Sequence, residues 1–377
     1  MSDIPEPDRL EGAPHPRQTA HLFGHQAAED TFLAAFNSAR LHHAWLISGP
    51  KGVGKATLAW RLARFLLATP EDDGGFFSPP KPSSLDIPDA DPVSHRLLAL
   101  SEPRLFLLRR PYDEKAERLR ADITVDETRT LRNFLSLTAA DGGRRVVIID
   151  SADDMNRSAA NGILKLLEEP PAKVTFLMIS HQPADLLPTI RSRCRDLRLA
   201  PMKPQDLSDA LTQAGAAIDP AEREGLAQLA GGSVGEAFRL SNLDGLKLYG
   251  ALMRLFSTLP NMDRNLARMI ADNGANRKTP EAFDLTVTLL DAFLARLARA
   301  AATRILPPEA ARGEAQLIER LASSEGAARI WADLAQHLGL RARKGKAVNL
   351  DPSALLMDMV LKVDETASQM ASSTAQR

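Results

Sequence analysis

Short apolar runs, separated by stretches with helical spacing, dominate the chain up to about residue 200. Each run is too short for a helix and lacks the polar alternation of a half-exposed strand, so it predicts a strand buried on both faces. The runs are residues 44–48, 105–108, 145–150 and 174–179, and residues 195–199 are predicted as a last strand. Strands that alternate with helices predict an α/β fold with a parallel, three-layer sheet.

Apolar residues at helical spacing predict helices around these strands. They are residues 26–40, 55–67, 125–137 and 158–169, the last of them stopped by Pro170 and Pro171. Residues 70–93 are rich in proline and have almost no apolar periodicity, so we expect a mobile surface insertion there. Residues 109–122 are highly charged and are expected to be exposed.

Alanine and leucine dominate after Pro201, and no further strand is predicted. Short helices at residues 206–214, 221–229 and 234–240 predict a small helical lid over residues 201–243. Longer amphipathic helices predict an all-α domain over residues 244–365. They are residues 246–258, 264–273, 280–302, 313–338 and 351–364. The polar segments at the two ends, residues 1–20 and 366–377, predict a flexible arm and a disordered tail.

The composition is that of an ordinary soluble globular protein, with 44% hydrophobic and 25% charged residues and a formal net charge of −1. With this balance, any contact with nucleic acid has to come from local patches such as the basic residues 341–346. The single cysteine, Cys194, excludes an internal disulfide and a cysteine-rich zinc site. We expect a cytoplasmic protein, because the sequence shows neither a signal peptide nor an apolar stretch that could span a membrane.

A glycine-rich loop follows the first predicted strand and leads into a helix. Gly49, Gly54 and Lys55 complete the pattern Gly-x-x-x-x-Gly-Lys, with Gly52 between them. Glycines let successive backbone N–H groups turn toward an anion at a helix N-terminus, and the lysine adds a charge at the terminal phosphates. The loop is therefore a candidate nucleotide site.

The residues that hydrolysis would require are only partly present. The position after Lys55, where a Ser or Thr hydroxyl would hold magnesium, is Ala56. Thr57 is the nearest hydroxyl and stays a candidate nucleotide contact, although it points about 100° away around the helix. Asp150 ends the third predicted strand, where an acid would reach magnesium, or else it caps the following turn. Ser151 follows it and cannot act as the base that polarises water.

Four motifs occur in the order found in AAA+ clamp-loader subunits, and the chain resembles that family. They are the glycine loop, residues 150–153 (Asp-Ser-Ala-Asp), residues 161–171 (Asn-Gly-Ile-Leu-Lys-Leu-Leu-Glu-Glu-Pro-Pro) and residues 187–194, which end in Ser-Arg-Cys. The resemblance covers residues from about 20 to 240 with motifs, whereas the remainder agrees only in being helical. It implies an AAA+ P-loop domain over residues 21–200, followed by the lid and a helical collar that joins subunits.

The resemblance also implies roles for single residues. In this family the Arg of Ser-Arg-Cys projects into the ATP site of a neighbouring subunit, so Arg193 is the candidate arginine finger. A planar, always charged guanidinium suits that role, and the alternative is a structural salt bridge beside Cys194. Ser180 or His181 falls where relatives carry a polar sensor of the γ-phosphate. In the lid, Gly235 replaces the arginine of a second sensor.

A non-hydrolysing clamp-loader subunit is the function that the resemblance implies. Ala56, Ser151 and Gly235 depart from the hydrolysing members, so we expect ATP to be held without being hydrolysed, and no zinc. The implied partners are gamma/tau-like ATPase subunits, a delta-like subunit, a sliding clamp and primed DNA, within a DNA polymerase (nucleotidyltransferase) holoenzyme. The alternative is an autonomous ATPase, either a loader motor or a remodelling enzyme, in which Ala56 and Ser151 would have to be tolerated.

Overall fold

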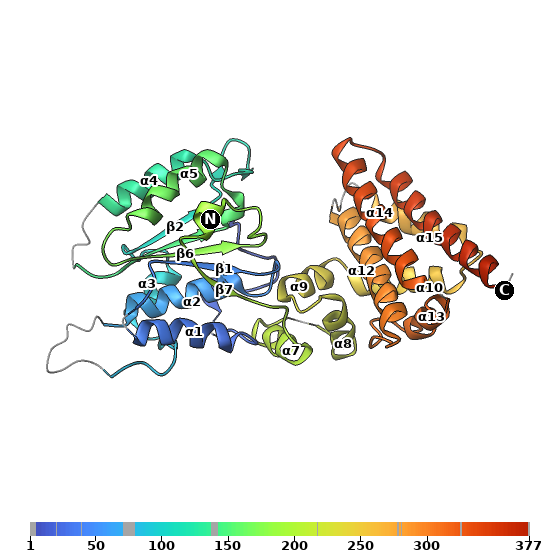
Figure 1. Cartoon of the computed structure of the whole chain (residues 1–377), viewed down its shortest axis with the longest axis horizontal. Coiled ribbons are helices and arrows are strands. Elements are labelled where there is room, and N and C mark those ends of the chain that lie inside the picture. Colours follow the sequence, from blue (N-terminus) through green and yellow to red (C-terminus); the bar gives the residue numbers. More distant parts are fainter. Residues whose placement is uncertain are drawn as a thin grey trace. The chain divides into compact units, whose positions relative to one another are not determined.

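The computed structural model describes residues 5–19, 21–38, 40–70, 80–136, 142–216, 218–276, 279, 281–324 and 326–375. The chain divides into two compact units (Figure 1). The first comprises Met1–Ala216 and Gly232–Glu236, and the second comprises Ala217–Gly231 and Ala237–Arg377. The predicted lid is therefore not a unit of its own, because its helices are shared between these two.

A five-stranded sheet forms the centre of the first unit, and every neighbouring pair of strands is parallel. In spatial order the strands are β2 (Leu105–Arg109), β5 (Arg145–Asp150), β6 (Val174–Ser180), β1 (Ala44–Ser48) and β7 (Arg195–Arg198). The α/β prediction is confirmed. The runs located β1, β5 and β6 closely, because strands buried on both faces carry continuous apolar sequence. β7 is different, because three of its four residues are exposed.

Helices cover both faces of this sheet (Figure 1). One face carries α1 (Gln26–Asn37), α2 (Lys55–Ala68) and α3 (Pro92–Leu98), and the other carries α4 (Val125–Ser136) and α5 (Arg157–Glu168). Two shorter helices, α6 (Pro188–Arg191) and α7 (Pro204–Gln213), flank the last strand in sequence.

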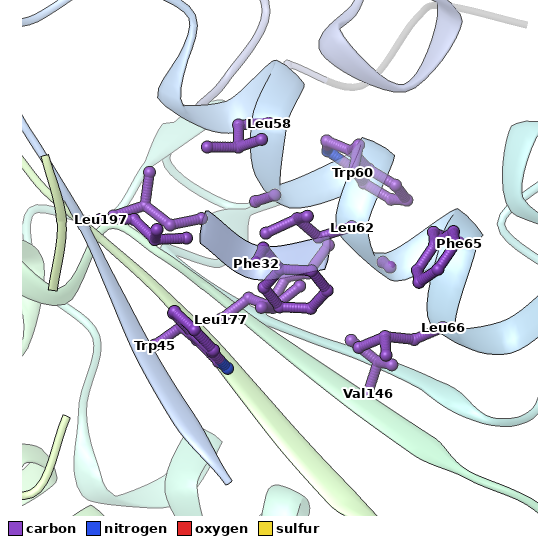
Figure 2. Close-up of a cluster of buried hydrophobic side chains, with 14 of the residues drawn as sticks. Phe32, Trp45, Leu58, Trp60, Leu62, Phe65, Leu66, Val146, Leu177 and Leu197 are labelled. Atoms are coloured by element: carbon purple, nitrogen blue, oxygen red, sulfur yellow. The ribbon is translucent and has the colours of Figure 1, made fainter. Parts of the chain in front are cut away.

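Each face of the sheet has its own apolar core. Trp45 and Ile47 of β1 belong to the core under α1 and α2, whereas Leu46 belongs to the core under α4 and α5. Figure 2 shows the first core, in which Phe32 of α1 lies against Trp45 of β1, and Leu58 and Leu62 of α2 belong to the same cluster. This packing fixes the start of α2, and with it the glycine loop, against the end of β1.

The N-terminal segment differs from its prediction as a flexible arm. Residues 16–18 form a short 3-10 helix, η1 (Pro16–Gln18), and His15 before it is 3% exposed. Arg17 and Arg109 both pair with Glu6, at 2.8 and 2.9 Å, and Arg109 also pairs with Asp8 at 3.2 Å. The acidic residues of this segment meet arginines supplied by the segment itself and by β2, which hold it in place.

The predicted mobile insertion, residues 70–93, is only partly covered by the described residues, because residues 71–79 lie outside them. Its second half is anchored: Leu85 is 3% exposed, Asp86 pairs with Arg61 at 2.7 Å, and Asp91 caps α3. The charged segment after β2 forms a small antiparallel hairpin of β3 (Tyr112–Asp113) and β4 (Arg118–Leu119), which was not predicted.

The second unit is helical, as predicted. Its helices are α8 (Pro220–Leu229), α9 (Val234–Asn242), whose first three residues belong to the first unit, α10 (Gly245–Ser257), α11 (Arg264–Gly274), α12 (Glu281–Thr303), α13 (Glu314–Leu321), α14 (Ala327–Ala347) and α15 (Pro352–Ala375). Within the described ranges, none of the chain's helices has both the length and the apolar character needed to cross a bilayer.

Two predictions for this unit are wrong. Residues 313–338 were expected to form one helix, but Gly326, at φ 78°, starts a separate helix α14. The tail was expected to be disordered from residue 366, but α15 continues to Ala375. Val363 and Ala367 are 0% and 3% exposed, so the apolar face continues for another turn and holds the helix in place.

A buried ion pair links the helices of the second unit. Glu314 is 1% exposed, and its carboxylate accepts hydrogen bonds from Arg296 Nε, Tyr249 Oη and the Ala310 N–H, each at 2.6 Å. Burial, and then the adjacent Glu314 charge, raise the pKa of the Tyr249 hydroxyl, so it stays a donor. Three groups therefore depend on this one carboxylate.

We expect Glu314→Ala to lower the free energy of unfolding by about 3–5 kcal/mol, because it leaves Arg296 buried without its counter-ion. Urea unfolding of the full chain measures this. Glu319→Ala is the matched control, because Glu319 is exposed on the same helix. Equal, small losses of unfolding free energy in both variants would show that the buried pair does not hold the helices together.

Candidate functional site

The glycine loop connects β1 to α2 in a conformation that only glycine adopts readily. Gly49, Gly52 and Gly54 have φ angles of 147°, 77° and 99°. A Cβ atom at Gly49 would lie 2.3 Å from the Leu199 carbonyl oxygen, and Gly54 is the N-cap of α2. The backbone therefore has the turn and the helix N-terminus that a phosphate-binding loop requires.

Lys55 is turned back onto this loop. Its ammonium donates to the carbonyl oxygens of Gly49, at 2.7 Å, and Pro50, at 2.5 Å, and the residue is 3% exposed. Burial lowers the pKa of Lys55 to about 8, and Asp150 and Asp153 only partly offset this. A phosphate at the loop would have to replace the two carbonyls as the partner of Lys55.

The start of α2 does not fit a magnesium ion. Ala56 has no side-chain oxygen to offer a hard cation, which takes oxygen ligands in octahedral geometry. Thr57 is half-buried one position further along the helix. The sequence-based conclusion that the loop lacks its metal-holding hydroxyl therefore stands in the folded chain.

Asp150 lies at the end of β5, near Lys55, as its motif predicts. Burial, together with the charges of Asp8 and Asp154, raises the pKa of Asp150 to about 7, and Lys55 opposes this. Within the described residues its Oδ2 atom is buried without a hydrogen-bond partner. The hydroxyl of Ser151, a residue that is 4% exposed, is likewise buried and unpartnered there.

Ser180, one of the two candidate sensors, is turned into the protein interior. It is 0% exposed, and its hydroxyl donates to Asp153 Oδ1 at 2.8 Å. The backbone N–H of His181 donates to the other oxygen of Asp153, at 2.6 Å. Burial, followed by the charges of Lys55 and Lys51, lowers the pKa of His181 to about 4, so a neutral imidazole faces the loop. Of the two candidate sensors, His181 is the one near the loop lysines.

The segment Gly232–Glu236 packs directly on the outside of the loop. Ser233 Oγ donates to the Lys51 carbonyl at 3.0 Å, and the Gly235 N–H donates to the Gly52 carbonyl at 3.1 Å. A Cβ atom at Gly235 would lie 3.0 Å from Gly52 Cα. The position expected to have lost a sensor arginine is thus a glycine-to-glycine contact, in which a side chain is strongly disfavoured.

Arg193 lies on a rigid turn between α6 and β7. Ile190 is 0% exposed, and the Cys194 thiol contacts Met178 Sδ at 3.7 Å. Burial, together with the Asp196 charge, raises the pKa of Cys194 to about 12, so the cysteine serves packing and is unreactive. The Arg193 side chain between these anchors is 34% exposed.

The guanidinium of Arg193 is held by its own turn and by α5. Nη1 donates to the Thr189 carbonyl at 2.9 Å, and Nη2 lies 2.9 Å from Glu168 Oε1. Sequence reasoning proposed a structural salt bridge as the alternative role of Arg193 but did not identify Glu168 as its partner. Glu168 belongs to the Leu-Glu-Glu-Pro-Pro stretch, yet nothing in that stretch indicates which acid faces the arginine.

Arg193 and the glycine loop lie at opposite edges of the sheet. β1 and β7 are parallel, with Trp45 opposite Arg195 and Ser48 opposite Arg198. The loop follows the carboxyl end of β1, whereas Arg193 precedes the amino end of β7. The paired residues alone span about 10 Å at the usual rise of a strand, and the turns on either side add to it. The two motifs therefore cannot complete one nucleotide site within this chain.

Comparison with known proteins agrees with these motifs. Residues 24–203 match the protein family described as DNA polymerase III, delta subunit. The chain is 41% identical over 152 residues to the delta-prime subunit of DNA polymerase III from Pseudomonas aeruginosa, covering 40% of this chain and 41% of that protein.

Two further relatives differ in how much of them is matched. The Escherichia coli delta-prime subunit is 26% identical over 350 residues, covering 89% of this chain and 92% of that protein. The gamma/tau subunit of DNA polymerase III from Mycobacterium tuberculosis is 28% identical over 244 residues, covering 61% of this chain and 37% of that protein. The chain thus spans less than half of the Pseudomonas and Mycobacterium proteins. By these matches the chain is similar to the delta-prime subunits of bacterial DNA polymerase III.

Proposed function

We propose that the chain is a non-hydrolysing, delta-prime-like subunit of a DNA polymerase III clamp loader. In this role it assembles with gamma/tau-like ATPase subunits and a delta-like subunit. It supplies Arg193 to the ATP site of a neighbour, and the assembly loads a sliding clamp on primed DNA. The family match and the relatives named as delta-prime subunits support this proposal.

The observation that carries the proposal is the separation of Arg193 from the chain's own glycine loop by the length of the sheet. An exposed arginine on a rigid turn, out of reach of its own phosphate site, suits a phosphate presented by another chain. A trans-acting arginine that stabilises the charge of phosphoryl transfer is worth ~10³–10⁵ in rate.

The absence of hydrolysis by the chain itself follows from three positions. Ala56 offers no magnesium ligand, Ser151 is a buried hydroxyl in place of a base, and Gly235 has no side chain. Loss of a general base costs ~10²–10⁴-fold, and loss of one preorganised electrostatic contact costs about 10²–10³-fold. An autonomous ATPase, the rival function, would have to overcome all three, so we do not favour it.

We propose that ATP nevertheless binds at the loop and is not turned over. Gly49, Gly52 and Gly54 retain the cradle of N–H groups, and Lys55 would hold the phosphates in exchange for its two loop carbonyls. Bound ATP would supply negative charge at the start of α2 rather than a group for this chain to transfer.

The second unit suits the role of a collar that joins subunits. Its surface leaves large apolar side chains exposed, among them Ile305 at 71%, Val348 at 60% and Leu340 at 54%. Two cations of its basic run are already ion-paired, Arg341 with Asp358 and Lys346 with Asp284. We therefore assign subunit contacts to this unit.

Replacing Arg193 by Ala in a reconstituted loader tests the trans role. We expect clamp- and DNA-stimulated ATP turnover at the completed site to fall by about 10³-fold, with assembly unchanged in size-exclusion chromatography. Arg191→Ala is the matched control, because Arg191 is an exposed arginine two residues earlier on the same turn. Wild-type turnover by the Arg193 variant would remove the finger role.

Nucleotide binding by the isolated chain tests the proposed cofactor. Equilibrium dialysis with labelled ATP should detect binding, and Lys55→Ala should weaken it at least tenfold, because the charge at the phosphates is lost. Lys203→Ala, which changes an exposed lysine at the start of α7, should leave ATP binding unchanged. Steady release of phosphate by the isolated chain would instead support the rival ATPase.

Asp150→Asn should stabilise the fold in a pH-dependent way. The folded-state pKa of Asp150 is raised to about 7, so the carboxylate opposes folding increasingly as pH rises from about 4 to 7. At pH 8 the Asn variant should gain on the order of 2 kcal/mol in unfolding free energy, and the gain should vanish near pH 4. Asp185→Asn, at an exposed site, is the control. An equal gain at both pH values would contradict the buried-charge explanation.

A further inference from the structure

We propose that Glu168 positions the arginine finger, holding the guanidinium of Arg193 where the phosphate of a neighbouring subunit arrives. This inference rests on the proposed trans role of Arg193 and adds a second residue to it. Glu168 is the last residue of α5, and its Oε1 atom lies 2.9 Å from Arg193 Nη2. It does not touch the reacting atoms, so its effect passes through Arg193.

The contacts of Arg193 leave one edge of its fork for a ligand. An arginine has five N–H donors. Within the described residues, its hydrogen bonds are made by Nη1, to the Thr189 carbonyl at 2.9 Å and to Ser192 Oγ at 3.4 Å. Nη2 carries two N–H groups and lies 2.9 Å from one Glu168 oxygen, so Nε and the second N–H of Nη2 are left to donate to a phosphate beside Glu168.

The backbone under Arg193 is already fixed, so the freedom that remains is in the side chain. The Arg193 N–H donates to the Ile190 carbonyl at 3.1 Å, and the Ser192 N–H donates to the Pro188 carbonyl at 3.0 Å. A long arginine side chain has many rotamers that a fixed backbone does not restrict. Glu168 restricts them from a different helix, and it thereby selects one direction for the guanidinium.

The position of Glu168 is unfavourable for its own helix, which supports a role outside it. The C-terminus of a helix carries partial negative charge and disfavours carboxylates. Both Glu168 and the C-cap residue Glu169 lie there, and both are exposed. The Arg193 cation offsets the charge of Glu168, whereas Glu169 has no ion pair with Arg193. The chain therefore offers an adjacent acid as an internal comparison.

The opposite role for Glu168 would be a brake that competes with the incoming phosphate. A competitor would have to occupy the donors that the phosphate needs. The two hydrogen bonds on Nη1 leave the N–H groups of Nε and Nη2, and one carboxylate oxygen cannot engage all of them. A positioning residue raises the rate and a brake lowers it. The sign of the effect of removing Glu168 therefore separates the two.

The test is a reconstituted loader that carries Glu168→Gln, with ATP turnover measured as kcat and KM in the presence of clamp and primed DNA. We expect kcat to fall about 10-fold with an unchanged KM for ATP, because the finger is misdirected rather than lost, and misplacement alone can cost ~10²-fold. Glu168→Asp, which keeps the charge, should recover part of the rate. Glu169→Gln should behave as wild type, and thermal melting should show all variants folded.

The same measurement in an Arg193→Ala background separates the possible failures. If Glu168 acts through Arg193, then Glu168→Gln should cause no further loss there. Wild-type kcat for Arg193→Ala would overturn the proposed function and this inference with it. A defective Arg193→Ala loader with normal kcat for Glu168→Gln would overturn the positioning role alone, and so would a kcat that rises.

Discussion

The parallel pairing of β1 with β7 is the constraint on which the rest of the site depends. Because both strands run in the same direction, whatever follows β1 and whatever precedes β7 must lie at opposite edges of the sheet. The phosphate loop follows β1 and the Ser-Arg-Cys turn precedes β7. The same backbone hydrogen bonds that build the sheet therefore keep the phosphate loop and Arg193 apart within this chain, as the proposed trans role of Arg193 requires.

The losses at the chain's own nucleotide site are physically connected. Gly235 packs on Gly52, so an arginine at residue 235 would require the loop and the segment Gly232–Glu236 to separate. Lys55 is buried among loop carbonyls, and Asp150 is buried beside Asp8, a residue of the N-terminal segment. Burial shifts the pKa values of both groups toward their neutral forms, and Ala56 offers no hydroxyl to hold a cation between them. A site that had to hold a metal and cleave a phosphate would need the opposite arrangement.

Sequence-based prediction is correct where the local pattern determines an element, and it is wrong where contacts with distant residues determine the structure. Buried parallel strands are continuous apolar runs, so β1 and β5 could be predicted with their bounds. The N-terminal segment was misjudged because its acids meet Arg109, about a hundred residues away in the chain. Ser180 and His181 could not be separated, because only Asp153 decides which of them turns inward. Glu168 was missed for the same reason, since nothing local distinguishes it from Glu169.

A glycine pattern can be present in a chain that lacks the chemistry associated with it, because the fold itself requires the glycines. At Gly49 a side chain would collide with the Leu199 carbonyl, and at Gly54 it would collide with Leu22, 2.7 Å from the added Cβ. These contacts tie the loop to the strand and segment beside it whether or not a phosphate is bound. The discriminating positions are Ala56 and Ser151, since a Ser side chain at 56 or an acid at 151 would serve chemistry rather than hold the loop in place. Their identities, more than the glycines, separate a chain that hydrolyses ATP from one that completes a site next door.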